Sequence, residues 1–168
     1  MKFRNTLVCL ATCAFAIASA SVITTNLVHG IGRAADASGN RAQFALDAGQ
    51  ISHNSDMRVT GDIQFEMPGA TAVGNTFVTM PRATAMSVLE NVATFSGPGV
   101  LRVVMHGSTA QYRGTVTVVA TSNRHPDEAG SPDTLSVSFA PTNAGDPTFS
   151  YTGDLTSGDI AVSTTVSY

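Results

Sequence analysis

The sequence predicts an all-β protein, an antiparallel β-sandwich or flattened barrel of about 8–10 short strands preceded by a signal-peptide helix. Two observations favour this class: apolar residues beyond position 41 recur with a period of two, and Gly, Pro and Asn clusters separate the apolar runs at short intervals. With 43% hydrophobic and 12% charged residues, the composition excludes a disordered tail. At 168 residues we expect one domain around one core.

The N-terminus has the features of a secretory signal. Lys2 and Arg4 precede an apolar stretch at 7–17, and small residues follow it at 18–20, where signal peptidase cleaves. The stretch is shorter than the roughly 20 residues that cross a membrane as a helix. We therefore expect cleavage near Ala20, secretion to the periplasm, the extracellular space or the cell surface, and no transmembrane helix in the mature chain.

Cleavage would also change the chemistry of the chain. Cys9 and Cys13 lie in the signal, so the mature chain would contain no cysteine and no disulfide. The alternative of a lipoprotein acylated at Cys13 is disfavoured by Thr12, because such signals require Gly, Ala or Ser there. Without Lys2 and Arg4, the balance is 7 Arg against 12 acids, a net charge of 7 − 12 = −5. The Arg residues are scattered singly, so we expect no nucleic acid as a partner.

Three parts make up the expected organisation: a signal peptide at 1–20, a flexible leader at 21–40 and a single all-β domain at 41–168. The leader is expected because this stretch is small and polar, contains Gly30, Gly32 and Gly39, and shows little periodicity. The strands expected in the domain are 42–48, 58–67, 76–80, 84–89, 92–95, 100–106, 110–121, 134–140, 148–152 and 159–168.

The clearest strand and the least certain one lie close together in the sequence. In 58–67, Ile63 and Phe65 alternate with Gln64 and Glu66. The segment 81–92 instead fits either a strand or a short helix, because its apolar residues also recur at helical spacing.

A polar loop at 122–133 is the candidate ligand site. Its metal-binding candidates are His125, Asp127, Glu128 and Asp133, and Arg124 lies beside them. Carboxylates can hold Ca²⁺, and a histidine with a carboxylate can hold a transition metal, but the spacing matches no established metal motif. The alternative is a solvated hairpin loop in which Asp133, at the mouth of a strand, accepts hydrogen bonds from loop amides.

No catalytic residue or cofactor is predicted. The four histidines, at positions 29, 53, 106 and 125, stand singly, and no nucleophile elbow accompanies them. Apolar residues alternate from Ile160 to Tyr168, which leaves a small outer-membrane β-barrel as an alternative.

The second half resembles a known family. Segments 111–118, 132–139, 148–153 and 158–162 follow an order of aromatic-basic-Gly, strand, polar loop, Asp-Thr alternation, Tyr-Gly turn and final Gly-acidic-Ile strand. This order is similar to that of the post-COAP-1 type of secreted bacterial β-domain. The resemblance implies an extracellular all-β domain of uncharacterised function and supplies no catalytic residue. The chain departs from the pattern in its Arg124-His125-Pro126 loop, which replaces a Gly-rich one.

Together these observations predict a secreted, non-enzymatic structural or binding module with an unknown extracellular or cell-surface partner. The alternatives are a small secreted metal-dependent binder or enzyme that uses the 122–133 loop, and the outer-membrane barrel.

Overall fold

The chain forms nine antiparallel strands and no helix within residues 22–69, 74–123 and 130–168, which are those that the computed structural model describes. The strands are β1 (Ile23–Ala35), β2 (Arg41–His53), β3 (Asp56–Met67), β4 (Asn75–Met80), β5 (Ala85–Leu89), β6 (Val92–Met105), β7 (Ser108–Thr121), β8 (Thr134–Pro141) and β9 (Phe149–Ser167). The predicted all-β class is therefore confirmed. The predicted signal peptide at 1–20 lies outside the described residues.

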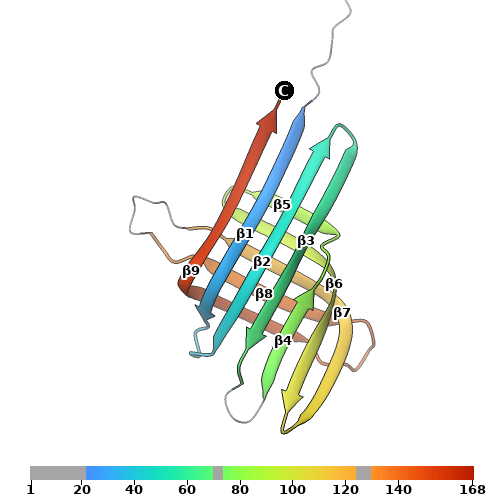
Figure 1. Ribbon diagram of the computed structural model, residues 1–168, viewed down its shortest axis with the longest axis vertical. Helices are drawn as coiled ribbons and strands as arrows, with labels where there is room; N and C mark the ends of the chain where they lie inside the picture. Colours follow the sequence, from blue (N-terminus) through green and yellow to red (C-terminus); the bar gives the residue numbers. More distant parts are fainter. Residues whose placement is uncertain (1–21, 70–73, 124–129) are drawn as a thin grey trace, which may run out of the picture.

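All nine strands belong to one sheet, in the order β4-β3-β2-β1-β9-β8-β7-β6-β5. Because β4 pairs with both β3 and β6, the sheet closes into a ring, and β5 pairs along the part of β6 that β4 does not reach. In Figure 1, the upper part of β9, β1, β2, β3, β4 and the adjoining ends of β6 and β7 form one layer, and β5, β8 and the remaining parts of β6, β7 and β9 cross behind it at a steep angle. A sandwich of two separate sheets is not confirmed, because the hydrogen-bonded pairing is continuous around the ring.

The core lies between these two layers and follows the predicted alternation. On β3, Ile63 and Phe65 are buried while Gln64 between them is exposed. The Phe65 ring lies 5.7 Å from the Phe149 ring and 5.1 Å from the Tyr151 ring, measured between centroids. Such tilted aromatic contacts add to the free energy gained by burying apolar area.

The predicted leader is wrong, because residues 23–35 form β1, which lies between β2 and β9. The glycines that indicated flexibility instead allow neighbouring strands to approach. A Cβ at Gly32 would overlap the carbonyl oxygen of Ser157 on β9, and a Cβ at Gly30 would lie 3.0 Å from the side chain of Ile160. Close packing, which a sequence pattern does not reveal, explains these glycines.

Two pairs of predicted strands are each one continuous strand. The predicted strands 92–95 and 100–106 both overlap β6, and the predicted strands 148–152 and 159–168 both overlap β9. The Gly-rich residues that were expected to end these strands bend them instead. In β9 the register with β1 shifts at Arg33/Ala34, and Gly158 beside this shift has a φ of 94°, so the strand turns from one layer toward the other.

The ambiguous segment at 81–92 contains β5 and no helix. Met86 is buried in the core, and the amide of Gln50 on β2 donates a hydrogen bond of 3.0 Å to the Met86 carbonyl. Pairing with β6 fixes the strand, because local propensity left both conformations open.

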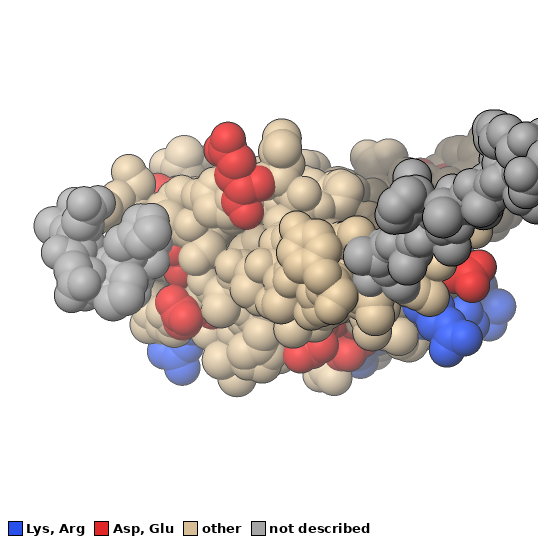
Figure 2. Space-filling model, turned by 90° about the horizontal axis from the view of Figure 1, so that it is seen from above, with Lys and Arg blue, Asp and Glu red and all other residues tan. Residues whose placement is uncertain are grey.

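Figure 2 shows the end of the molecule at which β9, β1, β2 and β3 extend beyond the other layer, where charged side chains are few and scattered. No helix within the described ranges is long and apolar enough to span a membrane.

Candidate functional site

Of the predicted metal ligands, Asp133 is the one that the structure describes. Arg124, His125, Asp127 and Glu128 lie outside the described residues. The Asp133 carboxylate is fully buried at the start of β8. Its Oδ1 accepts a hydrogen bond of 2.8 Å from the Asn123 backbone N–H, and its Oδ2 accepts one of 3.1 Å from the Ile160 N–H.

Asp133 therefore joins β7, β8 and β9. Its own carbonyl accepts a hydrogen bond of 2.8 Å from the Leu155 N–H, which adds a third link. A hydrogen bond from a loop amide to the Asp133 carboxylate was one of the two interpretations of this loop, and the Asn123 N–H donates such a bond. Within the described part of the chain, no group of three or more His, Cys, Asp or Glu side chains is placed to hold a metal ion.

The other described histidines lie apart. His29 Nδ1 lies 3.3 Å from Asp47 Oδ2, and both side chains are largely exposed. His106 has a φ of 45° and lies in the two-residue turn between β6 and β7, while His53 is the last residue of β2. The register thus places these three histidines at separate positions.

The main cavity is a groove of about 660 Å³ on the outer surface of the sheet, and it crosses β9, β1, β2, β3, β4 and β6. We call it the cross-strand groove. It is lined by Ile31, Gly32, Arg33, Gln43, Phe44, Ala45, Gln64, Phe65, Glu66, Phe77, Thr79, Arg102, Ser157 and Gly158.

Strand register explains this set of residues. One row of outward-facing side chains runs Ser157, Arg33, Gln43, Glu66, Phe77, Arg102, each opposite the next across neighbouring strands. A second row, two positions along each strand, runs Ile31, Ala45, Gln64, Thr79. The residues between the rows turn their side chains inward, as the buried Phe44 and Phe65 do, so main chain forms the floor of the groove.

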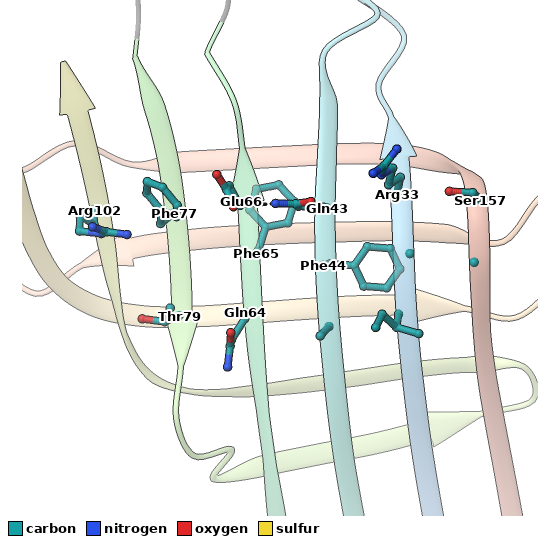
Figure 3. A pocket seen from close by; sticks show the side chains of 14 residues that line it. Arg33, Gln43, Phe44, Gln64, Phe65, Glu66, Phe77, Thr79, Arg102 and Ser157 are labelled. Carbon is teal, nitrogen blue, oxygen red and sulfur yellow. Dashed lines mark hydrogen bonds between the residues drawn. The ribbon is translucent and has the colours of Figure 1, made fainter. Parts of the chain in front are cut away.

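The groove combines polar and apolar groups. Gln43 Nε2 donates a hydrogen bond of 2.7 Å to Glu66 Oε2, and the Arg102 guanidinium lies 4.0 Å from the centre of the Phe77 ring. Figure 3 shows Gln43 and Glu66 extending toward each other from β2 and β3, with Phe77 beside Arg102 on the neighbouring strands. Ile31 is 62% exposed and adds apolar surface.

The groove has an excess of positive charge. Its lining contains two arginines, Arg33 and Arg102, and one carboxylate, that of Glu66, whereas the whole chain has a formal charge of −3. Among the described residues, no carboxylate forms an ion pair with either guanidinium.

Two shifted pKa values lie near the turn between β1 and β2. Hydrogen bonds lower the pKa of Asp36, first the 2.7 Å bond from the Asn40 side chain and then bonds from backbone N–H groups. Burial, and next the negative charge of Asp36, raises the pKa of Tyr151 to about 12. Since Asp36 and Tyr151 lie outside the groove lining, these shifts reflect the packing of the turn.

Sequence reasoning did not identify the groove. Gln43, Gln64 and Phe77 belong to predicted strands, and their alternation with buried residues marks them as outward-facing. The missing information was the register, which decides which outward side chains are neighbours.

The chain matches no family model, and no curated protein and no solved structure shows significant similarity to it.

Proposed function

We propose that the protein is an exported, non-enzymatic β-module that binds an acidic oligosaccharide along the cross-strand groove. The observation that carries this proposal is a pair of guanidinium groups, Arg33 and Arg102, that form no ion pair with any carboxylate of the described residues and lie near the two ends of one continuous row of polar and aromatic side chains. Export is supported by the basic and apolar pattern of the first 20 residues, and an extracellular role agrees with the resemblance to the post-COAP-1 type of domain.

The dimensions of the groove suit an extended ligand. From β1 to β6 the row crosses four strand-to-strand steps, which at about 4.8 Å each amount to roughly 19 Å. The groove lies on the outer surface, so a long chain can pass across it with both ends in solvent.

Its chemistry suits sugars with carboxylates. The amides of Gln43 and Gln64 and the hydroxyls of Thr79 and Ser157 can both donate and accept hydrogen bonds, as sugar hydroxyls require. A guanidinium binds a carboxylate through two parallel hydrogen bonds. Ile31 and Phe77 provide apolar surface for the C–H faces of sugar rings.

Binding without cleavage is proposed because of the carboxylates. Glycoside hydrolysis uses two carboxyl groups that flank the scissile bond. The described groove lining contributes Glu66, whose side chain already accepts a hydrogen bond from Gln43.

Calorimetric titration with an oligogalacturonate tests the proposal, with its methyl ester as the uncharged matched ligand. We expect the charged ligand to bind, and Arg33→Gln and Arg102→Gln each to weaken binding about tenfold, which corresponds to about 1.4 kcal/mol. Arg58→Gln is the control, since Arg58 is exposed on the same outer face of β3, six residues and roughly 20 Å from Gln64. Equal binding of both ligands, no binding at all, or an equal loss in the control would overturn the proposal.

A further inference from the structure

The last part of β9 is hydrogen-bonded on one side only. β8 pairs with Phe149–Asp154, whereas β1 pairs with β9 from Asp154 to Ser167. Within the described residues, no strand pairs with 161–167 on the side away from β1. In Figure 1 this segment forms the free margin of the layer at the upper end.

One hydrogen bond identifies the groups on this free margin. The Ile160 N–H donates to Asp133, so it points away from β1. Backbone groups alternate in direction along a strand, and the register with β1 is continuous here, so Val162, Thr164 and Val166 also direct their N–H and C=O groups to the free side.

This edge carries none of the features that usually prevent strand pairing. Residues 161–167 read Ala-Val-Ser-Thr-Thr-Val-Ser, without charge, proline or glycine. Other described segments that pair on one side only include the start of β3, which carries Asp56 and Arg58, the start of β7 at 108–113, which carries Arg113, and β5, where the Met86 carbonyl already accepts a hydrogen bond from Gln50. The edges of protein sheets are commonly blocked by charges, prolines or bulges. By this criterion the β3 edge is protected and the β9 edge is not.

We infer that two copies of this chain associate through antiparallel pairing of their β9 edges, centred on Thr164. This centre places Thr164 opposite Thr164 of the second copy and Val162 opposite Val166, so every N–H and C=O on the free side meets a partner. The pairing is isologous and closes after two copies. A β9-to-β3 contact would be open-ended and would bring Asp56 and Arg58 against the edge.

The inward-facing surface at this end favours the same partner. Thr164 Oγ1 donates to Asn26 Oδ1, and Asn26 Nδ2 donates to Gln50 Oε1, both at 2.8 Å, in a polar row across the inner face. Beyond this row Val166 and Val22 are 46% and 40% exposed. A two-fold axis perpendicular to the sheet keeps the inner faces of both copies on the same side, so these apolar side chains would adjoin those of the partner.

Sedimentation equilibrium of the purified protein over a range of concentrations tests the inference. We expect a reversible monomer–dimer equilibrium. Ser163→Lys with Thr165→Lys should weaken it at least tenfold, because residue 163 faces residue 165 of the partner and ammonium groups would then oppose each other. Both side chains are exposed, and their backbone groups face β1, so the fold should be kept.

The control variant carries Ser55→Lys with Thr60→Lys, which adds the same charge at exposed positions beside and on β3 and should leave the equilibrium unchanged. Mixing the double-Lys variant with a Ser163→Glu, Thr165→Glu variant should restore dimers, an effect that general destabilisation cannot produce. A protein that stays monomeric, a dimer insensitive to the β9 charges, or a mixture that remains monomeric would each overturn the inference.

Discussion

Removing the Asp133 carboxylate should destabilise the fold more than removing any exposed acid. The side chain is fully buried and accepts hydrogen bonds from two backbone donors, the Asn123 and Ile160 N–H groups. Hydrogen bonds to charged groups contribute about 1.5–3 kcal/mol each. Asp133→Ala leaves both donors unsatisfied, so we expect a loss of about 3–6 kcal/mol in the free energy of unfolding.

Urea denaturation measures this loss directly. The midpoint should fall while the slope stays constant, and the melting temperature should fall by roughly 6–24 °C for a domain of this size. Asp133→Asn keeps one acceptor oxygen but turns an amide NH₂ toward the other donor, so it should cost about half as much. Asp159→Ala is the control, because Asp159 neighbours Ile160 on β9 and is exposed.

Two results would refute the reasoning. One is a change for Asp133→Ala no larger than that for Asp159→Ala. The other is a rise in the melting temperature of the wild-type protein with Ca²⁺ or Zn²⁺ that disappears in Asp133→Ala, because a bound ion stabilises the folded state by mass action. The second result would make Asp133 a metal ligand, as the sequence-based alternative holds.

Three further predictions concern the core, β9 and alkaline pH. Phe65→Ala should lower the free energy of unfolding in urea by about 3–5 kcal/mol, because the ring is 2% exposed and contacts two aromatic rings. The control Met57→Ala, at a side chain that is 62% exposed, should change this free energy by less than about 0.5 kcal/mol. Gly158→Ala should destabilise several-fold more than Gly107→Ala, because both residues have positive φ but a Cβ at Gly158 would overlap the Ile31 carbonyl while Gly107 faces open space; equal losses would contradict this. Because the pKa of Tyr151 is raised from 10.0 to about 12, folding favours the neutral phenol, so the contribution of Tyr151 to stability should be constant below pH 10 and be lost between pH 10 and about 12. Tyr151→Phe should flatten the resulting fall in stability in thermal melts across that range, and an identical profile in the variant would count against the assignment.

Local alternation was enough to predict most strands of the domain. Ile63, Phe65 and Gln64 occupy the faces that their spacing indicated, and the Asp133-Thr134 step was recognised as a possible strand-mouth acceptor. The prediction of a flexible leader was wrong because Gly30 and Gly32 indicate flexibility when only the local sequence is considered. In the structure they make room for Ile160 and the Ser157 backbone, which lie more than 120 positions away in the chain. The prediction of two strands in place of β6, and of two in place of β9, was wrong for a similar reason. A glycine that bends a strand and a glycine that ends one look the same in the sequence.

The sequence by itself determined the all-β class and the inward or outward direction of most side chains, because both depend on residues adjacent along one strand. The tertiary structure decided that β4 closes the sheet onto β6, that β1 belongs to the sheet, and that Arg33, Gln43, Glu66, Phe77 and Arg102 form one row. These features depend on register between strands far apart in the chain, and register is fixed by side-chain packing across the whole ring, which no single segment specifies.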